Sequence, residues 1–301
     1  MISLVTLYDE AGLGPRLRDW LAGQGLDSRC QAAEIHAFPD GEIRVRVPEA
    51  VSETVVVVCT LDHPSEKTLA LTFVCDVLRG LGAKRLWLVT PYLAYMRQDI
   101  AFHPGEGVSA ASYARLLSRL VDAMVTVDPH LHRIPHLEDV YTVPSTALHA
   151  TDVIGDWLNG RLTGKALLIG PDRESEQWVT AVAARCGLPF RVLDKERLGD
   201  RQVVIQVPDL AAEGYETVVL VDDMVSTGHT LMQVARQLRA QGIRDVRAVC
   251  VHALFGEDTT DEMRDAGIGE LASCNTVAHV TNRIDVTPMI GRWIEDRLRG
   301  R

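Results

Sequence analysis

The stretch VVLVDDMVSTGHTL, residues 218–231, decides the fold class of this chain. Its apolar run ends in Asp222 and Asp223, a pattern typical of a buried parallel strand that reaches the edge of a sheet. A loop of small polar residues, STGHT (226–230), follows the acids. The apolar residues Leu231, Val234, Ala235 and Leu238 then recur at helical spacing. The stretch therefore predicts strand, loop and helix, one unit of an α/β fold.

The same alternation of strand and helix runs along the chain. Short β-branched runs occur at residues 2–8, 54–60, 85–92, 123–128, 165–172, 217–223 and 247–254. Continuous apolar strands between amphipathic helices favour parallel sheets covered on both faces. The runs form two clusters that divide near VPSTALHATDVIGDW (143–157). We therefore expect two α/β domains.

Length, charge and cysteine usage restrict the class of protein. A chain of 301 residues is about two average domains. The net charge of −10 argues against a general nucleic-acid binder, which needs a basic face. The six cysteines are scattered without a C-x-x-C pair, which favours a reducing compartment. The chain has no signal-peptide pattern and no apolar run of about 20 residues, so we expect a cytoplasmic protein with neither nucleic-acid nor membrane partners.

The opening stretch has the chemistry of a sugar-phosphate site. Ligands of doubly wound folds bind beyond the carboxyl ends of the strands. Paired carboxylates there can accept hydrogen bonds from two vicinal hydroxyls, and hydroxyl side chains at a helix start suit a phosphate. One alternative is a strand end followed by an ordinary helix cap. Another is a Walker-B acid, but the nearest P-loop candidate, GRLTGKA (160–166), is one residue short and ends in alanine.

This loop resembles the phosphoribosyl-pyrophosphate loop of phosphoribosyltransferases and of ribose-phosphate pyrophosphokinases. Five further stretches resemble the pyrophosphokinases, in the order of that family. They are AFPDGEIRVRVPEAV (37–51), TPYLAYMRQDIAFHPGEGVSA (90–110), VDPHLHR (127–133), IGPDRESEQWV (169–179) and VLDKERLGD (192–200). The resemblance covers nearly the whole chain. It implies two phosphoribosyltransferase-like domains, residues 1–145 and 146–287, with a C-terminal helix at about 288–301 that packs on the first.

The resemblance also implies which residues bind the substrates. The ATP-binding set comprises Phe38, Asp40, Glu42, Arg97, Gln98 and Asp99. The ribose 5-phosphate set comprises Asp222, Asp223, Ser226, Thr227, Gly228, His229 and Thr230. In the family, the hairpin with the first three ATP-binding residues reaches a neighbouring subunit, so we expect a dimer-based homo-oligomer such as a hexamer. Taken alone, that hairpin is also typical of a plain exposed turn.

The metal and the catalytic cations follow from the same comparison. His130 and Asp172 would lie near Mg²⁺, and Lys195 and Arg197 would act from a flexible catalytic loop. Taken alone, KER is also typical of a solvated loop. Three histidines, at 130, 132 and 136, raise zinc as an alternative, but they lack a closed ligand set.

Two segments depart from the family pattern. His229 replaces a glycine or alanine, and Glu174, Ser175 and Glu176 replace glycines.

We therefore expect a Mg²⁺-dependent ribose-phosphate diphosphokinase that converts ATP and ribose 5-phosphate to 5-phosphoribosyl 1-pyrophosphate and AMP. Two alternatives stay open at this point. One is a phosphoribosyltransferase that consumes this product and shares the DD loop. The other is a non-catalytic regulatory homologue that binds nucleotide.

Overall fold

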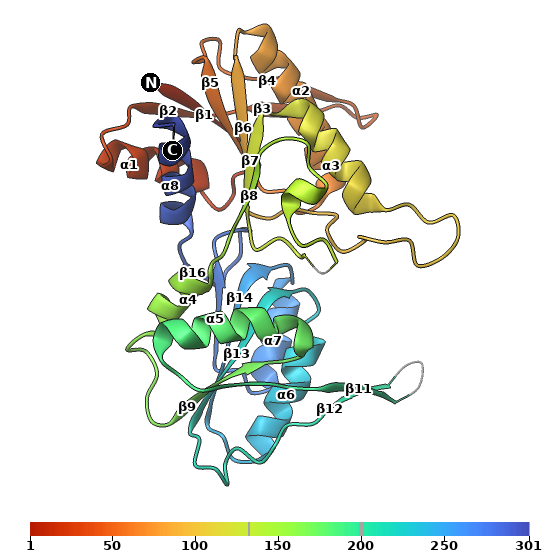
Figure 1. Cartoon of the computed structure of the whole chain (residues 1–301), viewed down its shortest axis with the longest axis vertical. Coiled ribbons are helices and arrows are strands. Elements are labelled where there is room, and N and C mark those ends of the chain that lie inside the picture. The colour runs from red at the N-terminus through yellow and green to blue at the C-terminus, as the bar shows by residue number, and fades with distance from the viewer. Residues whose placement is uncertain (132, 199–201, 301) are drawn as a thin grey trace. The chain divides into compact units, whose positions relative to one another are not determined.

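The computed structural model describes residues 1–131, 133–198 and 202–300, with the backbone alone for 195–198 and 202–204. The chain divides into two compact units. Unit 1 comprises Met1–Leu148 and Val286–Arg301, and unit 2 comprises His149–Asp285. Each unit has its own sheet and its own core (Figure 1).

Unit 1 is built on six parallel strands. These are β1 (Ile2–Leu7), β2 (Ser28–Ala32), β5 (Thr54–Cys59), β6 (Arg85–Val89), β7 (Ala123–Val127) and β8 (Ser145–Leu148), in the order β2-β1-β5-β6-β7-β8. An antiparallel hairpin, β3 (Glu34–Ala37) and β4 (Ile43–Arg46), lies between β2 and β5 in the chain. The helices are α1 (Leu13–Gly23), α2 (Pro64–Gly80), α3 (Ser109–Leu120), the short η1 (Leu137–Asp139) and the C-terminal α8 (Thr287–Leu298).

Unit 2 also has six parallel strands. These are β9 (Ala166–Gly170), β10 (Phe190–Val192), β13 (Thr217–Val225), β14 (Asp245–Ala253), β15 (Glu270–Cys274) and β16 (Asn282–Ile284), in the order β10-β9-β13-β14-β15-β16. Its antiparallel hairpin is β11 (Lys195–Leu198) and β12 (Gln202–Ile205). Its helices are α4 (Thr151–Leu158), the short η2 (Arg173–Ser175), α5 (Glu176–Cys186), α6 (His229–Ala240) and α7 (Glu257–Asp265).

The two sheets have the same strand order. Numbered within its own unit, each sheet runs 2-1-3-4-5-6, and each unit inserts a hairpin between its second and third sheet strands. The chain thus contains the same architecture twice. Mainly parallel sheets flanked by helices confirm the predicted fold class.

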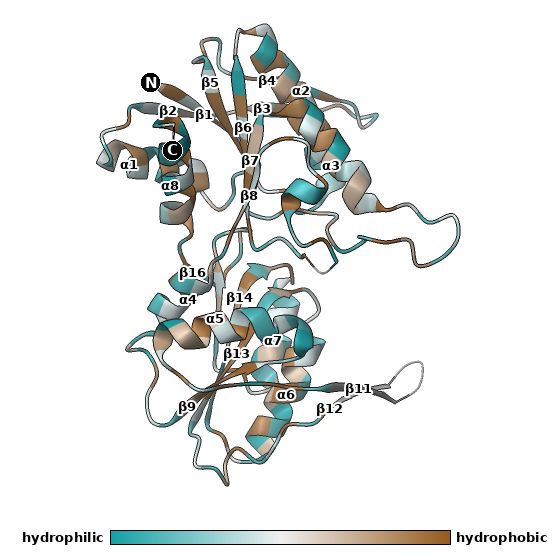
Figure 2. Ribbon diagram, in the orientation of Figure 1, coloured by the Kyte–Doolittle hydropathy of each residue, from teal (hydrophilic) through white to brown (hydrophobic). Residues whose placement is uncertain are grey.

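Apolar strands buried on both faces stabilise each unit. Every residue of β1, β5, β7 and β9 is buried, as expected where helices cover both sides of a parallel sheet. On one face of unit 2, Val234, Ala235 and Leu238 of α6 pack with Val218 and Leu220 of β13. Figure 2 shows brown, hydrophobic strands at the centre of both units. Each fully buried leucine or valine contributes about 1.5–3 kcal/mol.

Two further features concern membrane-spanning helices and the cysteines. Every helix in the described residues is too short or too polar to span a bilayer. The six cysteines all lie in the described part of the chain and form no disulfide.

Candidate active site

β13 carries the two adjacent acids, and it continues beyond them. It pairs with β9 as far as Leu220, whereas its ladder with β14 runs on to Val225. Asp222 and Asp223 therefore lie past the end of β9 but inside β13. The sequence pattern placed these acids at the end of the strand. The strand is longer because β14 supplies partners as far as Ala253.

The two carboxylates lie in a crowded, partly buried environment. An oxygen of Asp222 accepts the Asp223 N–H at 3.0 Å, and an oxygen of Asp223 accepts the Met224 N–H at 2.7 Å. Burial raises the pKa of Asp222 well above its usual range, and the charges of Asp223 and Asp172 raise it further. Carboxylates crowded in this way favour a ligand that brings hydrogen-bond donors or positive charge.

The segment after β13 forms the start of α6. Gly228 is the N-cap residue with φ 67°, in the left-handed region that glycine adopts at low cost. It offers no side chain to the first-turn amides, and the first turn contains no acidic residue. Ser226, Thr227 and His229 are exposed around it, and Thr230 is half-buried. A helix start with these properties suits a phosphate.

Asp172 follows β9 and organises the turn there. One of its carboxylate oxygens accepts the N–H groups of Glu174 and Ser175 at 3.1 and 3.3 Å, and the Ser175 hydroxyl donates to the Asp172 carbonyl at 2.6 Å. Ser175 is fully buried, whereas Glu174 and Glu176 are exposed. Arg173–Ser175 therefore form a capped turn that leads into α5, which begins at Glu176.

The hairpin β11–β12 carries the two predicted catalytic cations. Lys195 pairs with Ile205 and Arg197 with Val203 in its antiparallel ladder. Figure 1 shows the hairpin projecting from unit 2. The side chains of Lys195 and Arg197 lie outside the described part of the structure, so their roles stay predictions.

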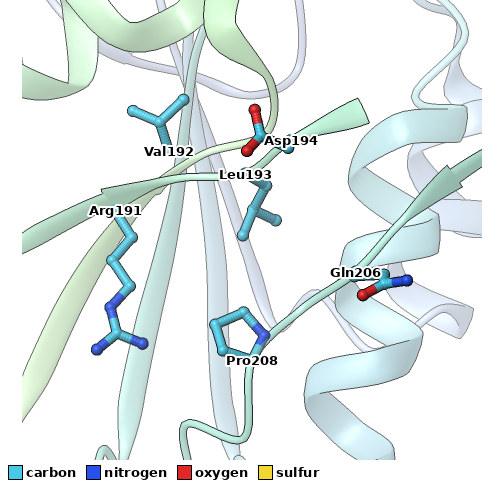
Figure 3. Close-up of a pocket in the computed structure, with 6 residues that line it drawn as sticks. All are labelled: Arg191, Val192, Leu193, Asp194, Gln206 and Pro208. Carbon is cyan, nitrogen blue, oxygen red and sulfur yellow. The ribbon is translucent and has the colours of Figure 1, made fainter. Parts of the chain in front are cut away.

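Two chain segments flank this hairpin and line a hollow at its root. Residues 191–194 and the pair Gln206 and Pro208 surround about 370 Å³ (Figure 3). Arg173, next to Asp172, donates through Nε to Asp194 at 2.8 Å. This exposed ion pair joins the turn after β9 to the root of the hairpin. Such exposed pairs contribute little stability.

Two glutamines hold the outgoing side of the hairpin, Gln237 in the last turn of α6 and Gln241 as its C-cap residue. The sequence interpretation did not find them. Gln237 donates to the Ile205 carbonyl at 2.8 Å and accepts the Val207 N–H at 3.2 Å. Gln241 accepts the Leu210 N–H at 3.1 Å. The two glutamines are four positions apart, which places them on one face at the end of α6. This spacing is the feature of the sequence from which they could have been found. The helix that begins at the STGHT loop thus also holds the segment after β12.

The hairpin β3–β4 presents the FPDGE residues at its turn. The Phe38 N–H donates to the Glu42 carbonyl at 2.8 Å, and an Asp40 oxygen accepts the Glu42 N–H at 3.1 Å. Phe38 is 40% exposed, and the His36 ring meets it edge to face with centroids 4.8 Å apart. An exposed aromatic ring held in this way is suited to stacking against a ligand.

The connections after β6 and β7 carry the other unit 1 candidates. Arg97 is exposed, and the Gln98 amide donates to the Ile100 carbonyl at 3.3 Å. Asp99 pairs with Arg133, with Nη1 and Oδ1 2.9 Å apart. His130 is half-buried. The sequence interpretation did not assign a role to Arg133.

The predicted residues are divided between the units. All six predicted ATP-binding residues and His130 belong to unit 1, whereas Asp172, both cations and the ribose 5-phosphate set belong to unit 2. In the described residues, no group of three or more His, Cys, Asp or Glu side chains could hold a metal ion. His132, one of the three histidines behind the zinc alternative, lies outside the described residues, and the pairing of His130 with Asp172 around Mg²⁺ stays a prediction.

Comparisons with known proteins cover both units. The family model for the N-terminal domain of ribose phosphate pyrophosphokinase matches residues 21–120, and that for the phosphoribosyl transferase domain matches residues 145–284. Ribose-phosphate pyrophosphokinase of Methanopyrus kandleri is 36% identical over 98% of this chain and 99% of its own. That of Sulfolobus acidocaldarius is 33% identical over 89% of this chain and 94% of its own.

A solved structure supports the fold. Phosphoribosylpyrophosphate synthetase from Mycobacterium smegmatis superposes with a TM-score of 0.79 at 22% identity, and the alignment covers all of both chains. The duplicated sheet, together with Asp222, Asp223 and the STGHT loop of unit 2, defines a phosphoribosyltransferase-like α/β protein. Within that class, the chain belongs to the ribose-phosphate pyrophosphokinase family.

Proposed function

We propose that this protein transfers the pyrophosphoryl group of ATP to ribose 5-phosphate, giving 5-phosphoribosyl 1-pyrophosphate and AMP. The observation that carries the proposal is the geometry of unit 2. Asp222 and Asp223 extend past the end of β9, and the loop after them leads into α6, whose first turn contains no acidic residue. The relatives of this chain are named ribose-phosphate pyrophosphokinase, and family models match both of its domains. Both findings support the same activity.

In this proposal, unit 2 binds ribose 5-phosphate through two elements. The first-turn amides of α6 and the hydroxyls of Ser226, Thr227 and Thr230 donate to the 5-phosphate. The carboxylates of Asp222 and Asp223 accept from the ribose hydroxyls, since ionised carboxylates have acceptors only. His229 follows the N-cap residue directly, so as an imidazolium it can add a donor to the phosphate.

ATP binds to unit 1 in this proposal. Arg97 offers a fork of N–H donors for phosphate oxygens, and Gln98 adds an amide. Phe38 stacks on the adenine of a neighbouring subunit, where Asp40 and Glu42 address the base or ribose. The proposal therefore includes a homo-oligomer in which each ATP site takes the FPDGE hairpin of another copy.

The reaction is an in-line displacement at the β-phosphorus. The anomeric hydroxyl loses its proton to solvent as its oxygen bonds to that phosphorus, the bond to the bridging α,β-oxygen breaks, and AMP leaves. Lys195 and Arg197 stabilise the charge that develops on the transferred group. Mg²⁺ would neutralise charge on the triphosphate, and His130 and Asp172 would help to hold it. Asp172 and Asp223 lie close enough for their charges to raise the pKa of Asp222, and carboxylate oxygens are a ligand type that Mg²⁺ accepts.

One pair of assays tests the proposal. Purified protein receives ATP, Mg²⁺ and ribose 5-phosphate, and AMP and 5-phosphoribosyl 1-pyrophosphate are measured. A parallel reaction supplies 5-phosphoribosyl 1-pyrophosphate with purine or pyrimidine bases, and pyrophosphate is measured. AMP formation that requires ribose 5-phosphate supports the proposal. Pyrophosphate release in the second reaction alone identifies a phosphoribosyltransferase, and inactivity in both identifies a non-catalytic homologue.

A further inference from the structure

Asp99 has an almost fully buried carboxylate whose charge is met by Arg133. Its side chain is 2% exposed. Oδ1 accepts a hydrogen bond from Arg133 Nη1 at 2.9 Å, and Oδ2 accepts the Arg133 backbone N–H at 3.2 Å. A carboxylate withdrawn from water in this way needs such partners, because an uncompensated buried charge is strongly destabilising.

The pair joins two loops that are far apart in sequence. Asp99 ends the RQD triplet in the connection from β6 to α3, and Arg133 lies three residues after His130 in the connection from β7 to β8. Residues 90–108 contain no helix or strand, and the Gln98 carbonyl accepts the Ala110 N–H at 3.2 Å, which ties one end of the triplet to α3. The ion pair supplies a fixed point two residues from Arg97.

The same arginine also contacts the far part of the first loop. Its guanidinium lies 5.7 Å from the centroid of the Phe102 ring. The Glu106 carboxylate accepts the N–H groups of Phe102 and His103 at 2.7 and 3.1 Å, which closes the loop on itself. Arg133 therefore touches the loop at two points, through Asp99 and through Phe102.

We propose that Asp99 and Arg133 form a positioning clamp that holds Arg97 and Gln98 for the ATP triphosphate, so that Asp99 itself makes no contact with ATP. This inference rests on the proposed function. A bare carboxylate beside a triphosphate would repel it, whereas one neutralised by Arg133 can order the loop without that repulsion. Such positioning matters for the reaction, because a misplacement of about 1 Å can cost about 100-fold in rate.

A double-mutant cycle separates a clamp from two independent contacts. ATP affinity is measured by calorimetry with MgATP and no ribose 5-phosphate, for Asp99→Asn, Arg133→Gln and the double variant. Each single change is expected to weaken ATP by about 10- to 100-fold, the range for losing a charged hydrogen bond. The double variant should be no weaker than either single one, because the pair acts as a unit. Arg133→Lys, which keeps the charge but loses the planar fork, should restore part of the affinity.

Arg79→Gln provides the matched control. Arg79 pairs with Asp122 at 2.8 Å in the same unit, between the last turn of α2 and the start of β7. Its loss should lower the melting temperature without changing ATP affinity. The KM for ribose 5-phosphate should stay unchanged in all variants, because that substrate belongs to unit 2.

Three results are decisive. Multiplicative effects in the double variant would show that Asp99 contacts ATP or its metal directly, and would overturn the clamp. ATP affinities within about twofold of wild type, with only the melting temperature lowered, would reduce the pair to a structural contact and overturn it equally. If the variants show the expected cycle in ATP affinity but the wild-type chain forms no product, the proposed activity is refuted while the clamp is supported.

Discussion

Gly228→Ala perturbs the start of α6 in two ways that the structure separates. Gly228 has φ 67°, and an L-residue in that conformation costs about 1–2 kcal/mol. A Cβ at this position would also lie 2.6 Å from Cε of Met263, whose side chain is fully buried in the core of unit 2. Overpacking of this kind costs about 1–3 kcal/mol. The free energy of unfolding should therefore fall by about 2–5 kcal/mol in total.

Gly187→Ala isolates the backbone part of this cost. Gly187 ends α5 with φ 68°, and a Cβ there meets no atom within 4 Å. This variant should lose about 1–2 kcal/mol, and only Gly228→Ala should also raise the KM for ribose 5-phosphate, because its first-turn amides shift. Urea unfolding and steady-state kinetics measure both quantities. Equal losses of stability with equal KM values in the two variants would refute the reasoning.

Four further outcomes test the site and the fold. Thr227→Val should weaken the binding of ribose 5-phosphate by about 1–3 kcal/mol, because one hydrogen-bond donor is lost, and should leave ATP affinity unchanged. A change in the KM values of both substrates would contradict this. Lys195→Ala should lower kcat by about 100- to 1000-fold with little change in either KM, and a change in KM alone would assign it to uniform binding. A Phe38→Ala chain mixed with an Arg97→Ala chain should regain activity after subunit exchange, whereas no recovery despite exchange proven by mass spectrometry would exclude a shared ATP site. Burial lowers the pKa of His279 in the folded protein, so the His279 imidazole binds a proton more readily in the unfolded chain. The free energy of unfolding should therefore fall as the pH drops through and below about 6.5. His279→Gln should remove that part of the fall in urea-unfolding titrations, and an unchanged pH profile would count against it.

The local sequence pattern was sufficient for the class of fold and for the order of the candidate motifs. Fully apolar runs such as 54–59 and 123–127 predict buried parallel strands, because both faces of each strand must meet a helix. The STGHT loop before an amphipathic run predicts the start of α6. The family resemblance was sufficient for the substrate hypotheses, and the comparisons confirm the family. The individual site residues stay predictions.

Other features depended on long-range arrangement. The strand order 2-1-3-4-5-6, repeated in both units, follows from which strands become neighbours in space, and no local pattern in the sequence indicates it. It makes β3–β4 and β11–β12 topological equivalents, although one carries FPDGE and the other KER. Gln237 meets the segment after β12 only because α6 packs beneath it.

The sequence by itself determined the fold class and the seven apolar strands of the predicted runs, because side-chain periodicity and turn chemistry act between residues a few positions apart. It did not predict other strands, including the β11 strand that carries Lys195 and Arg197. Only the tertiary structure decided that β13 continues past its two acids, that Arg173–Ser175 form a capped turn, and that Asp99 is neutralised by Arg133. The last contact joins residues 34 positions apart. Such a contact leaves no periodic signal in the sequence, since it forms only when two neighbouring parallel strands bring their following loops to the same edge of the sheet.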